Sequence, residues 1–269
     1  MFRFDPKSQY MMPAHFGPRQ FGKATARYND VTTMAVGYLT DREKLSRYLP
    51  EPFEVGAEPL VSVSYSMNRE IDWFAGRSYN ILGVNASAVF KGKEDHLAGS
   101  YCLVLWENLT DPILTGREIQ GIPKIYADIQ DHSVIGGVWS TSASHWGHKF
   151  VDLSIRDLRP ASDGELDALR KASNSGNWMG WKYIPTTGSG APGAEVSHAT
   201  LFPTSTTIRE ARYGTGTLEW HRLTWEQNPT QFHIVNALEE LPILEIRYAL
   251  VTKGGSDLAV PGRAVRALR

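Results

Sequence analysis

The side chains with the clearest chemical potential lie in residues 115–129, TGREIQGIPKIYADI. Lys124 follows Pro123, and a proline has no N–H for a strand ladder, so this pair belongs at the start of a strand, at an edge or at a bulge. An ammonium between Ile122 and Ile125 either reaches the solvent or is buried with a lowered pKa, and a lysine of the second kind can form Schiff bases. On composition alone, the solvated alternative is the more common one.

Three other motifs carry less chemistry. Residues 188–193 match GxGxxG, but no helical periodicity follows them, so a loop is the better interpretation than a dinucleotide site. His145 and His148 have a metal-like spacing without further ligands nearby, which favours a hairpin turn. The single cysteine, Cys102, lies in an apolar run and is expected to be a small buried hydrophobe. We therefore expect neither a metal nor a cofactor.

The totals restrict the classes of partner. The chain has 269 residues, with 28 basic against 29 acidic side chains and no basic stripe, so nucleic acid is not an expected partner. The first ten residues lack the apolar stretch of a signal peptide, and no apolar run reaches the length of a membrane helix. We expect a cytoplasmic protein of one domain, residues 1–269, in which residues 1–27 form an extended arm and no membrane is bound.

Alternation with a period of two predicts the elements that must position the lysine. Apolar side chains at 61, 63, 65 and 67 alternate with serines, which indicates a strand with one apolar face and one face of hydroxyls. Residues 81–90 and 101–106 form a predicted hairpin, and so do residues 134–144 and 150–155. Four further β-rich runs are predicted at 199–212, 217–225, 231–238 and 243–252.

Two capping boxes predict short helices, one starting at Thr40 with Glu43 and one at Ser162 with Glu165. Residues 177–197, rich in glycine, proline and threonine, are interpreted as a long loop and a candidate lid. Many strands with two short helices predict a mainly-β (α+β) fold, a barrel or a sandwich with α additions.

The segment around Lys124 also resembles the signature of the acetoacetate decarboxylase superfamily, a Gly-Arg-Glu followed by Pro-Lys-Lys. Further landmarks that are similar to the family's occur in its order, at residues 49–55 (LPEPFEV), 90–92, 178–185 and 241–245. The resemblance covers most of residues 30–255. It implies a closed β-barrel or cone of the acetoacetate decarboxylase type with a few short helices.

The resemblance assigns the Schiff base to Lys124, and two departures refine the expected chemistry. The family's second lysine is replaced by Ile125, so desolvation alone would have to lower the pKa of Lys124. The acidic residue and the arginine of the family's decarboxylases fall at Ile81 and near Val31, so both are absent. These departures argue against loss of the substrate carboxylate.

Gln120, four residues before Lys124, resembles the branch that acts on pyruvate-like 2-oxo acids as aldolase-dehydratases or hydratases. A neutral amide orients a carboxylate without repelling it. By the same analogy, Tyr248 is the expected proton carrier, with Arg117 and Glu118 as substrate-binding residues. The resemblance thus implies a lyase that takes a small keto acid, and it suggests a homo-oligomer. A 3-oxo acid decarboxylase and a non-catalytic binding barrel remain as alternatives.

Overall fold

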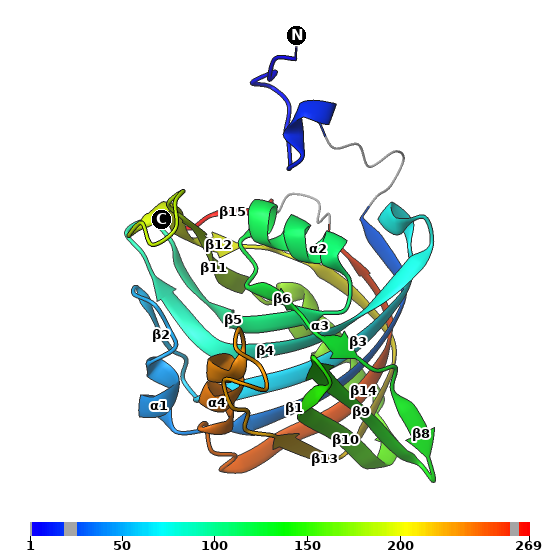
Figure 1. Ribbon diagram of the computed structural model, residues 1–269. Coiled ribbons are helices and arrows are strands. Elements are labelled where there is room, and N and C mark those ends of the chain that lie inside the picture. The colour runs from blue at the N-terminus through cyan, green and yellow to red at the C-terminus, as the bar shows by residue number, and fades with distance from the viewer. Residues whose placement is uncertain (1, 19–25, 259–263) are drawn as a thin grey trace.

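A single large β-sheet forms the frame of the molecule in the computed structural model, which describes residues 2–18, 26–258 and 264–269 (Figure 1). Its strands are β1 (Arg27–Leu39), β2 (Phe53–Val55), β3 (Leu60–Ile71), β4 (Arg77–Lys91), β5 (His96–Glu107), β6 (Lys124–Tyr126), β7 (Asp128–Ile129), β8 (Ser133–Ile135), β9 (Val138–His145), β10 (His148–Pro160), β11 (Trp178–Pro185), β12 (Ala194–Leu201), β13 (Ser205–Trp220), β14 (Glu245–Asp257) and β15 (Arg266–Ala267). The helices are α1 (Arg42–Ser46), α2 (Thr110–Thr115), α3 (Asp163–Ser175) and α4 (Phe232–Glu239). Short turns of helix add η1 (Ala14–Phe16), η2 (Asp72–Phe74) and η3 (Gly116–Gln120).

The sheet is strongly curved but not closed. Its strands follow the order β15-β12-β11-β5-β4-β3-β1-β14-β13-β10-β9-β7, while β2 pairs with β4, β6 with β5 and β8 with β9. Among the described residues, the end strands β15 and β7 do not pair with each other. The predicted mainly-β fold with a few helices is therefore confirmed, whereas the expected closed barrel is an open, wrapped sheet.

The two faces of β3 differ as the alternation predicts. Val61, Val63 and Tyr65 are fully buried in the main hydrophobic core. Ser64 and Ser66 point to the opposite face and line a cavity. Cross-strand partners project to the same side of a sheet, so this hydroxyl-bearing face continues onto β1 and β4.

The helices agree with the sequence in part. Ser162 and Glu165 form the predicted capping box of α3, with both hydrogen bonds present. The N-cap of α1 is Asp41, one residue after the predicted Thr40. Residues 231–238, predicted as a strand, form α4 instead. There Val235 and Leu238 are buried at helical spacing, and that spacing outweighed the strand preference of the β-branched side chains.

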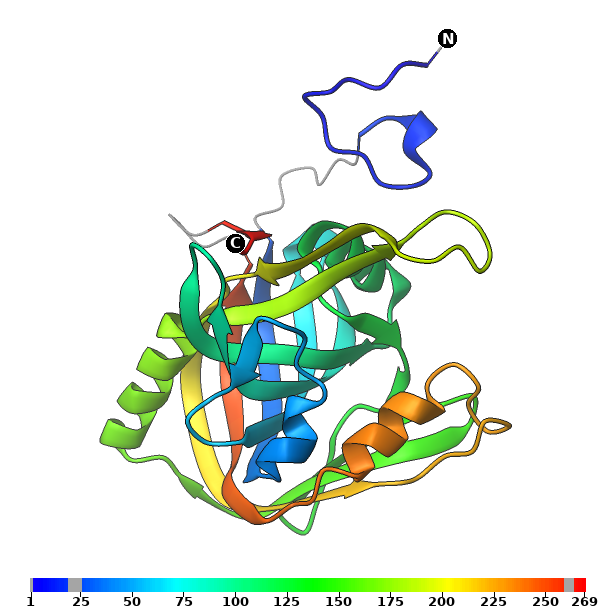
Figure 2. The same cartoon turned by 90° about the vertical axis from the view of Figure 1, so that its left-hand side faces the viewer.

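Residues 177–197 are not an irregular loop. Most of them form the hairpin of β11 and β12, whose turn contains the GxGxxG match and is closed by the bond from Thr186 N–H to the Gly193 carbonyl. Figure 2 shows this turn projecting away from the body. Only Asn177 and Trp178 of this stretch line the cavity, so the projecting turn lacks the position of a lid.

Within the described residues, no helix combines the length and the apolar character that crossing a bilayer requires.

Candidate active site

A cavity of about 380 Å³ lies over the hydroxyl-bearing face of the sheet. Thr33 of β1 and Ser64 and Ser66 of β3 contribute hydroxyls, and the Thr33 and Ser66 hydroxyls are hydrogen-bonded at 2.9 Å. The end of α3, the start of β11 and residues 202–204 complete the wall. The volume falls in the range of sites for small molecules.

Lys124 lies in this cavity as the first residue of β6. Its side chain is 9% exposed, and Nζ lies 2.8 Å from Oε1 of Glu107 and donates to the carbonyl of Pro112 at 3.1 Å. Pro123 directly precedes the strand, as the missing N–H requires, and its carbonyl accepts from Leu105 N–H of β5. The side chain of Lys124 is therefore buried and not solvated, and it has an ionic partner that the sequence did not suggest.

Glu107 is the site residue that sequence reasoning missed. It ends β5, it is fully buried and it lines the cavity. Burial raises the pKa of its carboxyl, and the neighbouring Lys124 acts in the opposite direction. The available signal was one acidic residue at the end of the apolar run YCLVLWE, since a buried charge requires a partner.

The position of Glu107 bears on the missing acid of the family. Glu107 and Ile81 are direct cross-strand partners in β5 and β4. Val31 and Ile81 both line the cavity, so the positions aligned with the decarboxylases' arginine and acid do face Lys124's site. A carboxylate is thus present in the cavity, supplied by the neighbouring strand.

A short π-helical turn brings Gln120 to the lysine. This turn, η3, ends where Gly121 takes a left-handed φ of 73°, and the half-buried Gln120 lines the cavity with Lys124. The structure therefore brings together the predicted pair. The first residue of the turn, Gly116, also lies close to the lysine, since a Cβ on Gly116 would lie 2.4 Å from Cδ of Lys124.

The other predicted residues lie outside the cavity lining. Arg117 is exposed, and its guanidinium donates to the backbone carbonyl of Lys124 at 2.9 Å, so it braces β6 rather than facing the cavity. Glu118 is half-buried and does not line the cavity either. Tyr248 donates to the hydroxyl of Ser62 at 2.9 Å and covers Gly37. It shares the hydroxyl-bearing face but lies beyond the cavity, and its role stays a prediction.

Two other tyrosines do reach the cavity. The hydroxyls of Tyr28 and Tyr79 are 2.8 Å apart and buried. Burial is the main cause that raises the pKa of both phenols, and the charge of Glu107 adds to it. At neutral pH this pair offers neutral hydroxyls that can donate or accept hydrogen bonds.

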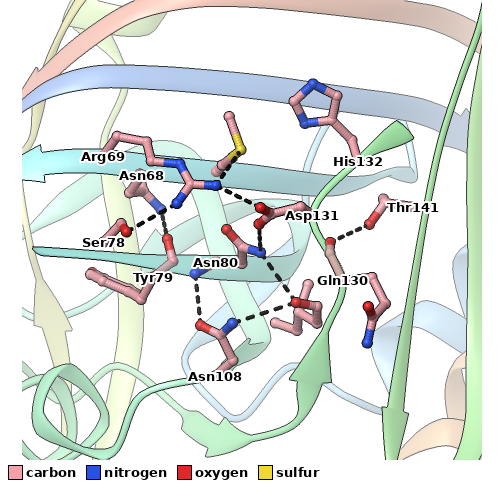
Figure 3. A network of polar contacts seen from close by, with 12 residues as sticks. Asn68, Arg69, Ser78, Tyr79, Asn80, Asn108, Gln130, Asp131, His132 and Thr141 are labelled. Atoms are coloured by element: carbon pink, nitrogen blue, oxygen red, sulfur yellow. Dashed lines mark hydrogen bonds and ion pairs between the residues drawn. The ribbon is translucent and has the colours of Figure 1, made fainter. Parts of the chain in front are cut away.

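A polar network fixes the end of β3 and the start of β4, the strand that carries Tyr79 (Figure 3). Asp131 binds Arg69 at 2.6 Å and accepts from Asn80 at 2.8 Å. Asn68, which lines the cavity, donates to the carbonyl of Tyr79 at 3.3 Å. Asn80 N–H in turn donates to the side chain of Asn108 at 2.7 Å, just after β5.

Neither the histidines nor the cysteine form a second site. His145 and His148 flank the predicted turn between β9 and β10, and His145 is bonded to Asn228 at 3.2 Å. Burial raises the pKa of the Cys102 thiol to about 12, which leaves it unreactive at neutral pH.

One cluster among the described residues has the spacing of metal ligands. The ligand atoms of Asp152, Glu219 and His221 lie within 4.8 Å of one another. Lys149 Nζ already lies 2.6 Å from the Asp152 carboxylate, and an ammonium at that distance repels a cation. None of these residues lines the cavity.

Comparisons with known proteins agree on one family. A family model described as acetoacetate decarboxylase matches residues 11–254. An acetoacetate decarboxylase of Paraburkholderia phytofirmans is 36% identical over 136 residues, which are 47% of this chain and 51% of that relative, so the match spans about half of the relative's length.

The similarity in fold covers almost the whole chain. The crystal structure of acetoacetate decarboxylase from Legionella pneumophila has a TM-score of 0.72 at 18% identity, covering 94% of this chain and 92% of that one. The enduracididine biosynthesis enzyme MppR, complexed with the condensation product of pyruvate and imidazole 4-carboxaldehyde, has a TM-score of 0.70 at 14% identity, with coverages of 98% and 97%. At these identities the likeness concerns the fold.

Proposed function

Because the chain belongs to the acetoacetate decarboxylase family, we propose that it is a lyase in which Lys124 forms a Schiff base with a small 2-oxo acid such as pyruvate. The observation that carries this proposal is the position of Lys124 Nζ, buried at the wall of a cavity large enough for such a substrate. An amine attacks a carbonyl carbon, and the resulting iminium draws electrons from the adjacent carbon. Once that carbon has lost a proton, it can add to the carbonyl of an aldehyde, and the product can lose water across the new C–C bond. Alternatively, a C=C bond next to the iminium can add water.

Gln120 supports the assignment to aldolase-dehydratase or hydratase chemistry. Its amide lines the same cavity, where a neutral donor can hold a substrate carboxylate or carbonyl without a change of net charge. The MppR complex supports the same chemistry by analogy, since its ligand is a condensation product of pyruvate and an aldehyde. We assign the binding of the 2-oxo acid to Gln120 and the covalent step to Lys124.

Glu107 favours a second candidate, a 3-oxo acid decarboxylase. A carboxylate fixed 2.8 Å from the lysine amine would lie close to the carboxylate of a bound 3-oxo acid. Repulsion between the two charges raises the energy of the bound substrate and is relieved when CO2 leaves. The cavity therefore supplies the kind of acidic residue that the sequence alignment with decarboxylases lacked.

Borohydride trapping separates these functions. The protein is incubated with pyruvate or with acetoacetate, reduced, digested, and the peptide containing Lys124 is examined by mass spectrometry. We expect an adduct on Lys124 and none on Lys91, which is an exposed lysine in a surface pair with Glu54. Release of CO2 from acetoacetate would decide for the decarboxylase.

The matched control is the double variant Lys124→Met with Glu107→Gln, which removes both buried charges together and so leaves neither unpaired. It should remain folded and show no adduct. Folded wild-type protein that gives no Lys124 adduct with either keto acid would rule out both lyases and leave a non-catalytic binding cavity.

A further inference from the structure

The carboxylate of Glu107 is buried with unusually little compensation. Both oxygens are inaccessible to solvent, and among the described residues no group donates a well-directed hydrogen bond to either of them. Their cationic partner is Lys124, whose Nζ lies 2.8 Å from Oε1. Moving two charges out of water is costly, and their mutual attraction offsets that cost only when the geometry is good and further hydrogen bonds satisfy the remaining atoms.

A purely structural ion pair would have a different environment. Buried charges that serve stability have their remaining oxygens and protons satisfied by further hydrogen bonds. Here Lys124 has one additional acceptor, the Pro112 carbonyl, while Oε2 of Glu107, a residue that lines the cavity, has no hydrogen-bond partner among the described residues. This arrangement leaves the carboxylate able to receive and release a proton next to a bound substrate.

We propose that Glu107 is a catalytic residue that carries protons between Nζ of Lys124 and the carbonyl oxygen of the substrate during Schiff-base formation. The assignment rests on the proposed function of Lys124 and names the acid–base group of that site. Its carboxylate lies within hydrogen-bond distance of the nitrogen that reacts, which is the first requirement of a general acid or base.

Each proton transfer balances. Glu107 takes one proton from the ammonium, the free amine attacks the carbonyl carbon, and the C=O π electrons move to oxygen, which receives that proton from Glu107. Glu107 then takes a second proton from the positively charged nitrogen of the adduct. As the nitrogen lone pair forms the C=N bond, the C–O bond breaks and Glu107 protonates the leaving hydroxyl to give water.

The pair thus begins as ammonium with carboxylate and ends as iminium with carboxylate. The net charge of the buried pair and the reacting carbonyl together stays at zero in every intermediate, so no step has to create an unpaired charge in the cavity. Burial, which raises the pKa of the Glu107 carboxyl, makes the protonated form accessible at the stage when an acid is required.

The test measures how fast the adduct forms and not only how much forms. Wild type, Glu107→Gln and Glu107→Asp are mixed with pyruvate and reduced with borohydride at successive times, at pH values from 5 to 10. The control is Glu54→Gln, which makes the same Glu-to-Gln change in an exposed Lys–Glu pair outside the cavity. Thermal unfolding establishes that each variant is folded.

We expect Glu107→Gln to reach a similar final amount of adduct at a rate lower by about 100-fold or more, the usual contribution of a general acid–base group. The wild-type rate should have a bell-shaped pH profile, because the Glu107 carboxylate must first take a proton and the protonated carboxyl must later give one, and the Gln variant should lose the limb on the acidic side. Glu107→Asp, which keeps the carboxylate, should retain the bell at a reduced rate.

A Gln variant that forms the adduct at the wild-type rate and with the wild-type profile would overturn the role of Glu107. If the Gln variant does not fold, the Asp variant decides. Adduct formation by the Asp variant at the wild-type rate, or with a pH profile that has only one limb, would overturn the role of Glu107. Wild-type protein without any Lys124 adduct would instead refute the proposed function itself, so the two failures are distinguishable.

Discussion

At the scale of single residues, the space around Lys124 is set by Gly116. The backbone of Gly116 has φ −65° and ψ −42°, which any residue can adopt, so its lack of a side chain serves the close approach of the lysine. A Cβ there would lie 2.4 Å from Cδ and 2.5 Å from Cε of Lys124. The lysine would have to move from its place beside Glu107.

We expect Gly116→Ala to lower the rate of adduct formation with pyruvate by tenfold or more and to lower the melting temperature. Borohydride trapping and thermal unfolding measure the two effects. The control is Gly164→Ala in α3, where nothing lies within 4 Å of the new methyl group and helix propensity favours alanine by about 1 kcal/mol. Equal behaviour of the two variants would contradict this account.

The cross-strand pair of Ile81 and Glu107 gives a second prediction. Cross-strand Cβ atoms lie about 5 Å apart, so Ile81→Glu alone would place two carboxylates side by side in the cavity and destabilise the fold. Adding Glu107→Ile transfers the single acid to β4. We expect this double variant to be more stable than Ile81→Glu and to form the adduct faster than Glu107→Ile alone, as measured by thermal unfolding and trapping. Additive effects of the two changes would show that the positions do not exchange roles.

At the scale of elements, α4 is tied to the strands of the site by one glutamine. Gln231, buried just before α4, accepts from Trp106 Nε1 at 2.8 Å and donates to the Tyr126 carbonyl at 2.9 Å. Trp106 precedes Glu107 in β5, and Tyr126 belongs to β6 with Lys124. The helix therefore helps to fix both strands that carry the ion pair.

Gln231→Leu would leave the buried Trp106 donor unpaired, at a cost of about 1–3 kcal/mol, and would also remove the donor to the part-buried Tyr126 carbonyl. We expect a loss of about 2 kcal/mol or more in the free energy of unfolding, measured with urea, together with slower adduct formation. Gln130→Leu, at an exposed side chain, is the control and should change the free energy of unfolding by less than about 0.5 kcal/mol. The prediction fails if the two variants are equally stable.

The C-terminal residues are held by Asp95. Its carboxylate accepts from the Arg266 guanidinium at 2.6 and 2.8 Å and from Arg269 N–H at 3.0 Å, and these bonds lower its pKa from 3.8 to about 2. Because the folded-state pKa is the lower one, this stabilisation is fully present above pH 4 and is lost as the pH falls toward 2.

Asp95→Asn should therefore lower the melting temperature at pH 7, by an amount that shrinks between pH 4 and pH 2. Calorimetry of both proteins across this range measures the difference. Glu94→Gln, next to it, removes only an exposed carboxylate 3.9 Å from Arg269, and should have little effect at any pH. A difference for Asp95→Asn that does not depend on pH would contradict the ionic explanation.

At the scale of the whole molecule, the features that depend on local sequence patterns were predicted more successfully than those that depend on long-range contacts. Lys124 and Gln120 lie on one short segment, and the hydroxyl face of β3 follows from a period of two. Glu107 was missed because its importance depends on the parallel pairing of β5 with β6, which aligns Leu105 with Lys124. Sequence alone does not specify such register.

The same dependence on long-range contacts explains the other differences between the predicted and the observed structure. The strand of Tyr248 was predicted, but its distance from the cavity depends on where β14 lies along β1, where Tyr248 faces Gly37. Whether the sheet closes depends on the total curvature of many strands, to which no single motif corresponds. Segment 231–238 had the composition of a strand and the spacing of a helix, and packing decided for the helix.

The N-terminal arm remains as the part of the molecule that a single chain does not explain. Phe2, Phe4 and Tyr10 contact one another edge to face, with Phe4 5.0 Å from each of the other two rings. Met12 and Phe16 are each 82% exposed. In both views, the described part of the arm stands clear of the sheet (Figures 1 and 2). Apolar groups exposed in this way are typical of surfaces that another molecule covers.

We expect a second copy of this chain to cover the arm, in agreement with the homo-oligomer that the family resemblance implies. Deleting residues 2–18 should then reduce the molecular mass measured by sedimentation equilibrium, and Met12→Ser with Phe16→Ser in the full chain should reduce it in the same direction. The cavity of Lys124 is lined by residues from 28 onward, so slow adduct formation with pyruvate should persist in the smaller species. An unchanged mass in both variants would mean that the arm's apolar side chains serve a contact other than self-association.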